Sequence, residues 1–348
     1  MPRVVGIDPG TVSIDVCGLD DGRLVLDRAW PTADALSDPD GFISYLRSAG
    51  PPALLTGLSG YGLPLVPVAQ ATEDDWRLAF LAATGEEGGI GGLRRLARSI
   101  AAAELPMVFL PGVVHLDTVP GHRKLNRVDL GTADKLCAAA LAIADQATRR
   151  RIPVDQTALV LLEIGGAFTG AIAVEGGRIV DGVGGTSGPL GWRASGALDG
   201  EVAFLAGNVG KELLFRGGLE SIVAADAGLG ATARAGLIEG AVKTVRSLRV
   251  SAPSAKEVVL SGRHAPDVAE ALAERLADLA VVPLVGFARA AKQGAQGAAL
   301  LADGLAGGRH RDLVETLRLR HAHGSVLDHL FVVDAARARR RLGLSANE

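Results

Sequence analysis

Two short stretches of the sequence combine an acid, glycines and hydroxyl side chains at a spacing that suits phosphate chemistry. The first is GIDPGT near the N-terminus, and the second is EIGGAFTG near the middle of the chain. In both, an apolar strand ends in an acid and a glycine turn follows, which leaves backbone N–H groups uncovered for phosphate oxygens. The residues expected to contact phosphate are Gly10, Thr11, Ser13, Gly165, Gly166 and Thr169.

The acid before each turn, Asp8 or Glu163, is a candidate ligand of a magnesium ion. Mg²⁺ prefers oxygen ligands and keeps several waters, so a carboxylate at a strand end can hold it through water. Two such corners that face each other would hold a polyphosphate across a cleft. The alternative is an ordinary β-hairpin corner, which the recurrence of the pattern in register disfavours.

A dense polar run, HRKLNRVDLGTADK at 122–135, precedes a strongly apolar helix. Arg123 is a candidate for stabilising a phosphoryl group in transfer, because cations compensate the charge of its oxygens. Asp129 and Asp134 are the candidate bases if the phosphoryl acceptor is an alcohol, whose proton must be removed. The alternative is a solvated loop and helix cap.

The elements around these stretches indicate an α/β protein with an internal duplication. Strands are expected at Arg3–Asp8, Val12–Leu19 and Arg23–Trp30, with an Asp-Gly hairpin between the last two. After a helix at Gly131–Arg150, the same strand, glycine turn, strand, hairpin, strand order returns at 157–183, now with a Gly-Gly hairpin. We therefore expect a first domain at 1–152 and a second at 153–348, whose last helices are an open candidate for packing back on the first.

Further elements follow from composition and periodicity. Helices are expected near Pro39–Ser48, Asp74–Ala83, Gly92–Ala103, Asp199–Leu205, Ala231–Arg249 and Ala335–Leu342, and within 261–276 and 290–308. Strands are expected near Pro106–Leu110 and Glu257–Leu260, and a short one at the start of 52–64, before a glycine-rich loop.

Composition excludes several classes of protein. The formal net charge is −3 and the isoelectric point about 6.2, so no large basic excess is available for nucleic acid. The longest apolar runs are too short to cross a bilayer, and we expect no membrane association. Cys17 and Cys137 form no zinc pattern and lie in apolar stretches, as expected of buried thiols in a cytoplasmic protein.

Taken together, GIDPGT, EIGGAFTG, VVLSGR and QGAQGAALLADG resemble, in order, the motifs of the superfamily of acetate and sugar kinases, heat-shock-protein-70 ATPases and actin. The helix DLGTADKLCAAALAIA stands where that superfamily has its first connecting segment. The resemblance implies two ribonuclease-H-like domains with an interdomain nucleotide cleft, and ATP and Mg²⁺ as cofactors. It places Ser261, Gly262 and Arg263 beside the nucleoside. The alternative for these three is a plain strand-to-helix turn.

A closer resemblance, carried by HRKLNRVDLGTADKL and LSGYG, is to a prokaryotic family labelled predicted butyrate kinase. It implies an ATP-dependent phosphotransferase whose small-molecule acceptor is a short-chain carboxylate. Arg193 lies in a polar glycine-rich loop similar in character to the one that follows the second phosphate motif in acetate kinases. That loop is otherwise a surface loop. The chain departs from the superfamily at Glu163, where an aspartate is usual.

Other functions stay open at this point. The same phosphate motifs would serve a small-molecule alcohol or sugar kinase, or an ATP-hydrolysing switch that acts on a partner protein. A homodimer is an open alternative to a monomer. GIDPGT also resembles Holliday-junction resolvases, but these are expected to be shorter and to carry a basic face. The histidines show no metal-pair spacing and no cysteine cluster is present, which disfavours metal-dependent threonylcarbamoyl transferases and iron–sulfur dehydratase activators.

Overall fold

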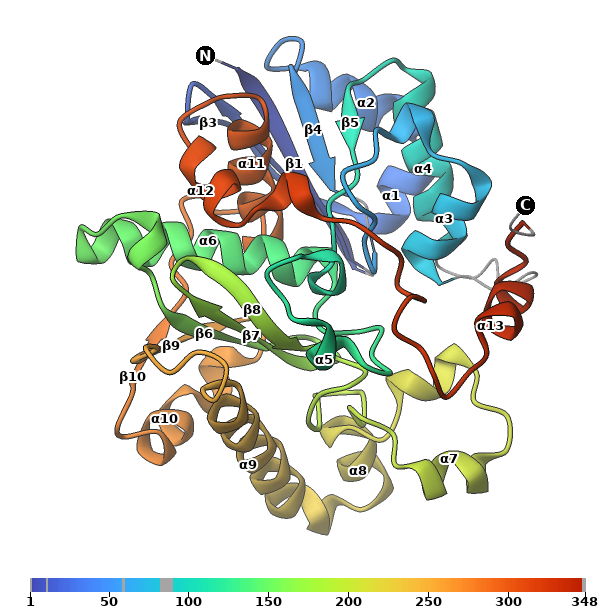
Figure 1. Ribbon diagram of the computed structural model, residues 1–348, viewed down its shortest axis with the longest axis vertical. Coiled ribbons are helices and arrows are strands. Elements are labelled where there is room, and N and C mark those ends of the chain that lie inside the picture. Colours follow the sequence, from blue (N-terminus) through green and yellow to red (C-terminus); the bar gives the residue numbers. More distant parts are fainter. Residues whose placement is uncertain (1, 11, 58–59, 82–89, 346–348) are drawn as a thin grey trace.

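The computed structural model describes residues 2–10, 12–57, 60–81 and 90–345. Within them the chain forms two five-stranded sheets with the same strand order (Figure 1). The first sheet runs β3-β2-β1-β4-β5 and the second runs β8-β7-β6-β9-β10. In each, the first three strands of the repeat are antiparallel and the last two join in parallel. The duplication predicted from the sequence is therefore present in the topology.

The strands match the predicted hairpins closely. The bounds are β1 Arg3–Pro9, β2 Ser13–Asp20, β3 Arg23–Pro31, β4 Leu54–Gly57, β5 Met107–Val108, β6 Leu159–Ile164, β7 Thr169–Glu175, β8 Arg178–Val183, β9 Glu257–Ser261 and β10 Ala280–Pro283. Both hairpin turns place two residues at positive φ, Asp21-Gly22 and Gly176-Gly177, which is the backbone that a two-residue hairpin requires.

Helices occupy the connections. The bounds are α1 Thr32–Ser37, α2 Pro39–Arg47, α3 Glu73–Phe80, α4 Ile90–Ala102, α5 Gly121–Lys124, α6 Ala133–Arg150, α7 Gly200–Ala206, α8 Leu219–Ala225, α9 Gly230–Leu248, α10 Ala265–Arg275, α11 Gln293–Leu305, α12 Arg311–Thr316 and α13 Ala335–Leu342. Helices α1, α5, α8 and α12 and strand β10 have no counterpart among the sequence predictions. All five are short, so periodicity carries little signal for them.

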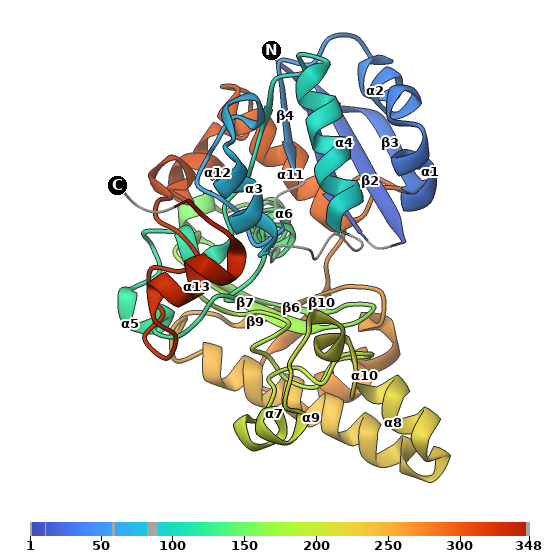
Figure 2. The same cartoon turned by 90° about the vertical axis from the view of Figure 1, so that its right-hand side faces the viewer.

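The molecule is layered. Figures 1 and 2 show α1–α4 on one side of the first sheet, α6 and α11 between the two sheets, and α9 and α10 beyond the second sheet. Three buried apolar clusters lie between the layers: one under α1–α4, one around α6 and α11 that reaches both sheets, and one under α9 and α10. Small residues let the middle layer pack closely: a Cβ on Gly297 of α11 would lie 1.8 Å from the carbonyl oxygen of Cys137 in α6.

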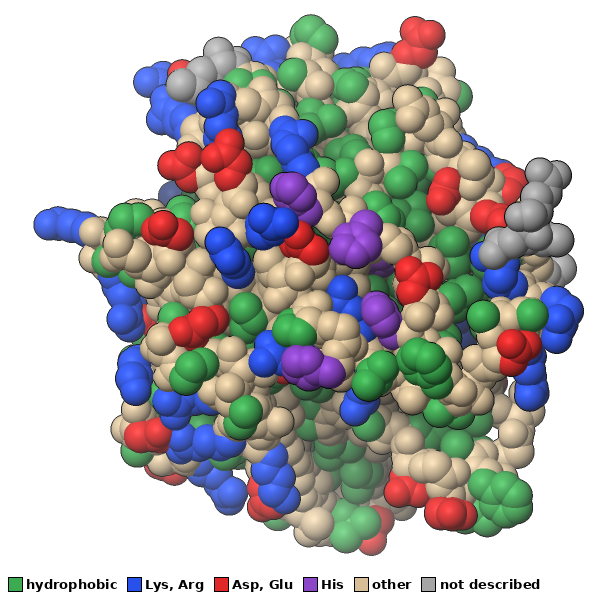
Figure 3. Space-filling view, in the orientation of Figure 1, with side chains coloured by type: hydrophobic (Ala, Val, Ile, Leu, Met, Phe, Trp, Pro, Cys, Tyr) green, Lys and Arg blue, Asp and Glu red, His purple; other side chains and the backbone are tan. Residues whose placement is uncertain are grey.

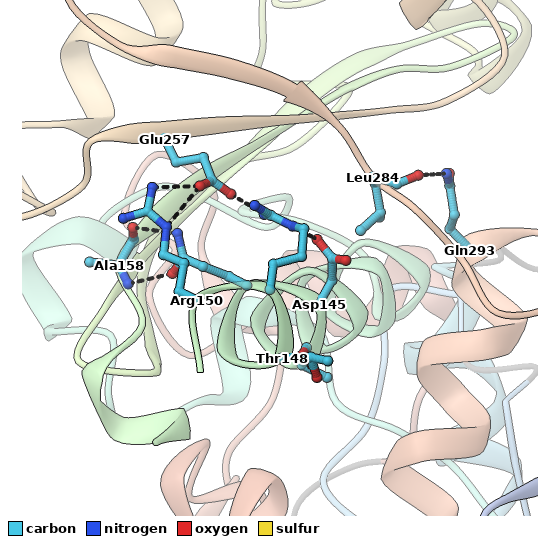
Figure 4. A network of polar contacts seen from close by, with 10 residues as sticks. Asp145, Thr148, Arg150, Ala158, Glu257, Leu284 and Gln293 are labelled. Carbon is cyan, nitrogen blue, oxygen red and sulfur yellow. Dashed lines mark hydrogen bonds and ion pairs between the residues drawn. The ribbon is translucent and has the colours of Figure 1, made fainter. Parts of the chain in front are cut away.

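The C-terminal end of α6 is fastened to the second sheet by charge. Glu257 at the start of β9 is buried, and its carboxylate accepts hydrogen bonds from Arg149 and Arg150 (Figure 4). Arg149 also bonds Asp145 one turn earlier in the helix, at 2.7 Å. The last turn of α6 is thereby tied to the strand that leads to Ser261.

The surface matches the balanced composition. On the face in Figure 3, basic and acidic side chains are interspersed, as expected from a net charge of −3. None of the helices in the described part of the chain combines the length and the apolar composition that crossing a bilayer requires.

Candidate active site

The two glycine corners have the same local structure. In the first, the Gly10 N–H donates to the carbonyl oxygen of Ser13 at 2.9 Å, and in the second the Gly165 N–H donates to that of Phe168 at 2.9 Å. Asp8 and Glu163 each lie two residues before the glycine, at the ends of the equivalent strands β1 and β6. Thr11, which was expected to contribute a hydroxyl, lies outside the described residues.

A pocket of about 480 Å³ opens between the two halves, a volume within the range of small-molecule sites. It lies where the two acids, helix α6, the end of β9 and the chain before α11 meet. Its walls are Asp8, Asp134, Ala138, Glu163, Ser261, Gly262, Arg263, Gly286, Ala288, Arg289, Ala290, Ala291, Lys292, Gln293, Gly294 and Gln296. Six residues singled out in the sequence thus come together from positions spread over more than half of the chain.

Asp8 is the acid with the least compensation in this pocket. Its carboxylate accepts no hydrogen bond within the described part of the chain, and Gly294 of α11 faces it so closely that a Cβ there would lie 2.6 Å from Oδ2. Burial, and then the nearby charge of Asp134, raise the pKa of Asp8 to about 7, against the opposing effect of Lys292 and Lys135. A cation bound at this carboxylate would be strongly stabilised.

Glu163 is held differently. Lys135 Nζ lies 2.7 Å from Glu163 Oε1 and 2.7 Å from Asp134 Oδ2. Although burial disfavours its charge, the two carboxylates raise the pKa of Lys135 well above its ordinary value. Burial would raise the pKa of Asp134, but the Lys135 ammonium and a hydrogen bond from the Thr132 hydroxyl hold it below its ordinary value. Asp134 and Glu163 therefore share one ammonium.

The residues present fit a hydrated magnesium ion. The pocket offers carboxylate oxygens, the ligand type that Mg²⁺ prefers. Among the described residues, no three His, Cys, Asp or Glu side chains are placed to enclose a metal by themselves. This suits Mg²⁺, which is commonly bound by one or two carboxylates together with waters and substrate phosphates. Asp8 is the best-placed ligand, since Glu163 is already paired.

The end of β9 forms the opposite wall. Gly262 has φ +95°, and a Cβ there would lie 2.4 Å from the carbonyl oxygen of Ile164, so the position requires glycine. Ser261 is buried, and Arg263 lines the pocket. The next residue, His264, stacks on Trp192 with ring centroids 3.6 Å apart. The turn is thus held firmly against the second glycine corner.

The second corner is open on one side. A Cβ on Gly166 would meet nothing within 4 Å, which leaves room for a ligand beside its backbone. Arg193 lies next to it, because its Nε donates to the Gly166 carbonyl oxygen at 3.2 Å. Thr169, by contrast, is fully buried, so its hydroxyl does not reach the surface of the corner.

Two catalytic candidates lie away from the pocket. Asp129 is buried, and its Oδ2 accepts from the backbone N–H and the hydroxyl of Thr186, each at 2.9 Å. Arg123 donates to the Val180 carbonyl oxygen at 2.7 Å and forms an ion pair with Asp181 at 3.6 Å. Both side chains fasten the 121–131 stretch to strand β8 and the loop after it. The polar run in the sequence is therefore largely structural, with Asp134 as the member that lines the pocket.

Two residues that the sequence analysis did not select, Lys292 and Asp15, lie at the first corner. Lys292, immediately before α11, lines the pocket, and its Nζ lies 2.6 Å from Ser13 Oγ and 2.9 Å from Asp15 Oδ2. The hydroxyl of Ser13, expected to contact phosphate, is thus shared with this lysine and with Asp15. Two sequence signals were available: an acid inside an apolar strand at Asp15, and a lysine at a helix N-terminus, where a cation opposes the helix dipole.

Solved structures similar to this chain include an acetate kinase and a propionate kinase. A propionate kinase from Francisella tularensis has a TM-score of 0.58 at 13% identity, over 86% of this chain and 98% of the kinase. An acetate kinase from Entamoeba histolytica has a TM-score of 0.56 at 11% identity, over 79% of this chain and 86% of the kinase. These likenesses are likenesses of fold, and they confirm the predicted architecture of two ribonuclease-H-like domains.

Sequence comparison gives less detail. A sequence model of one protein family, described as "Protein of unknown function (DUF1464)", matches residues 6–332. No curated protein matches the chain. Since the description of the matching family states no activity, the resemblance to the family labelled predicted butyrate kinase stays a prediction.

Proposed function

The chain belongs to the DUF1464 family, and from its site we propose that it is an ATP- and Mg²⁺-dependent phosphotransferase that acts on a small molecule, in the first place a short-chain carboxylate. The observation that carries this proposal is the pocket between the two repeats, onto which the acids of both glycine corners open. The fold shared with acetate and propionate kinases supports it.

The proposal assigns roles by position. The Gly10 corner and the open side of Gly166 bind phosphate oxygens. Ser261–Arg263, which line the pocket, bind the nucleoside. Asp8, with Glu163 beside it, holds Mg²⁺, which when bound supplies charge compensation to the phosphate oxygens. Arg193, next to Gly166, is the candidate cation on the acceptor side. The protein's own contribution is positioning and electrostatic stabilisation.

The preference for a carboxylate acceptor rests on the two bases predicted from the sequence, neither of which is suited to remove a proton. A carboxylate acceptor is already ionised at pH 7 and needs no proton removed. Of the two predicted bases, Asp129 is buried and already accepts two hydrogen bonds from Thr186, and the pKa of Asp134 lies below its ordinary value, which makes it a weak base. A small-molecule alcohol is the second candidate acceptor. Asp8, with a pKa of about 7, favours it if that residue acts as a base and not as a metal ligand.

The test is an ADP-release assay with Mg-ATP and a panel of short carboxylates, sugars and polyols, with hydroxylamine added to trap acyl phosphates. We expect acyl hydroxamate with a short carboxylate, and none with Asp8→Asn. Asp40→Asn, an exposed acid in α2, is the matched control and keeps full activity. ADP release that only a sugar or polyol stimulates would replace the acyl kinase by an alcohol kinase. ATP hydrolysis that no acceptor stimulates would favour the switch that acts on a partner protein.

A further inference from the structure

The chain before α11, residues 287–292, is fastened to the first sheet although it follows strand β10 of the second. Asp27 in β3 accepts backbone N–H hydrogen bonds from Arg289 at 2.8 Å, Ala290 at 3.0 Å and Ala291 at 2.7 Å. Burial acts the other way, but these three bonds hold the pKa of Asp27 below its ordinary value. A carboxylate of the first half thus fixes a pocket wall contributed by the end of the chain.

Asp15, in the neighbouring strand β2, also binds this segment of chain, at Lys292. Its Oδ1 accepts the backbone N–H of Lys292 at 3.1 Å, and its Oδ2 lies 2.9 Å from the ammonium of the same residue. The Ser13 hydroxyl donates to Asp15 Oδ2 at 2.7 Å and accepts from Lys292 Nζ at 2.6 Å. Asp15 is only 1% exposed, so the lysine is held at both its backbone and its side chain by one buried carboxylate.

The Lys292 ammonium lies directly over the first phosphate corner. A Cβ on Gly10 would be 3.0 Å from Lys292 Nζ. The side chain is nevertheless 46% exposed and lines the pocket. An ammonium has three N–H donors, and Ser13 and Asp15 use two of them. One donor is therefore left for a ligand at the Gly10 corner.

This position is unfavourable in the absence of a ligand. Lys292 is the N-cap residue of α11, where the helix dipole disfavours a cation and where Ser, Thr, Asp and Asn are preferred. Removing Asp15 from water has a further cost. An anion at the corner would be attracted by both the ammonium and the helix N-terminus.

We propose that Lys292 is a phosphate-binding residue, whose ammonium binds the phosphoryl oxygens of a nucleoside polyphosphate seated at the Gly10 corner. Asp15 and Asp27 are its positioning residues: the first holds the ammonium, and the second holds the backbone that carries it. This inference rests on the proposed function for the identity of the nucleotide. It does not need phosphoryl transfer to occur.

The experiment is equilibrium binding of ATP, ADP, AMP and adenosine to the full-length wild type and to Lys292→Met. Loss of one charge-assisted contact predicts an affinity for ATP that falls by about 10- to 100-fold, with adenosine affinity changed less than about 2-fold. Lys292→Arg, which keeps the charge, recovers part of the loss. Lys243→Met is the matched control, because this lysine is 75% exposed on α9, and it binds ATP as the wild type does.

Two further measurements keep the inference falsifiable. As a single substitution, Asp27→Asn is expected to weaken ATP binding. In the double variant with Lys292→Met it should weaken ATP binding no further, which separates positioning from general destabilisation. If the wild type binds no nucleotide, the proposed function fails, and inorganic tripolyphosphate becomes the probe. Tripolyphosphate binding that Lys292→Met abolishes would sustain the phosphate site, and no binding of either probe would overturn it. Unchanged ATP affinity in a folded Lys292→Met, checked by thermal unfolding, would overturn it as well.

Discussion

Lys135 Nζ lies 2.7 Å from Glu163 Oε1, so the acid of the second phosphate corner is already paired with an ammonium from helix α6. The equivalent acid of the first corner, Asp8, has no such partner within the described residues. Two corners of the same backbone structure therefore differ in charge. Because of this asymmetry, Asp8 is the acid available to bind a cation, whereas the charge of Glu163 is partly compensated by Lys135.

Lys135→Met tests this asymmetry. Without the ammonium, Asp134 and Glu163 lose their shared partner at the pocket wall, and two uncompensated carboxylates attract divalent cations. We expect Mn²⁺ to bind more tightly in the absence of nucleotide, by at least about 10-fold, and the free energy of unfolding to fall by about 2 kcal/mol. Electron paramagnetic resonance of free Mn²⁺ and urea denaturation measure the two effects. Unchanged or weaker Mn²⁺ binding would show that the lysine does not occupy a cation position.

Gly297→Ala probes the contact between α6 and α11. The added methyl group would lie 1.8 Å from the Cys137 carbonyl oxygen, so the helices must separate. Overpacking of this kind costs about 1–3 kcal/mol. Gly236→Ala in α9 is the matched control: its Cβ would make an ordinary contact of 3.7 Å with Leu190, and the better helix propensity is worth about 0.5–1 kcal/mol. In urea denaturation, the free energy of unfolding should fall for Gly297→Ala and rise for Gly236→Ala. A change of the same sign in both variants would contradict the close packing of α6 against α11.

Glu257→Ala removes the buried partner of Arg149 and Arg150 at the end of α6. Breaking a buried pair from one side is strongly destabilising, but both arginines are more than one third exposed and can regain water. We therefore expect a loss of about 2 kcal/mol. Glu239→Ala, which removes an exposed acid paired with Lys243, should leave the unfolding temperature almost unchanged. Thermal unfolding of both variants decides whether the network in Figure 4 stabilises the fold.

The duplicated hairpin units were predictable because their signals are local. The Asp-Gly and Gly-Gly turns, the alternating apolar strands and the acid two residues before each corner glycine all lie within about twenty residues of sequence. The corresponding strand order then follows from the repeat. Short elements such as β10 were missed because four residues at a sheet edge carry almost no pattern.

The site was only partly predictable, for a different reason. Asp129 and Lys292 are both polar residues before a helix, and the sequence alone does not predict which groups each side chain will bond. The Asp129 carboxylate accepts hydrogen bonds from the N–H and the hydroxyl of Thr186. Lys292, by contrast, pairs with Asp15, which is 277 residues away in the sequence. Only the packing of α11 against the first sheet brings that pair together.

The buried histidine His115 should make stability depend on pH. Burial lowers its pKa to about 4, and its Nδ1 lies 3.3 Å from the Gly112 carbonyl oxygen, to which the neutral ring donates. The unfolded chain takes up this proton near the ordinary pKa of about 6.5 and the folded chain only near 4, so its stabilising contribution is complete above pH 6.5 and is lost as the pH falls toward 4. The expected loss is about 3 kcal/mol.

His115→Asn isolates this contribution, since the amide can replace the Nδ1 donor but does not titrate. Urea denaturation between pH 4 and pH 7 should show a smaller dependence on pH for the variant than for the wild type. The difference between the two curves cancels the other titrating groups, provided that they keep their surroundings. His323→Asn, which removes an exposed histidine whose backbone N–H donates to the His115 carbonyl oxygen, is the matched control. Parallel curves for wild type and His115→Asn would mean that folding does not shift the pKa of His115.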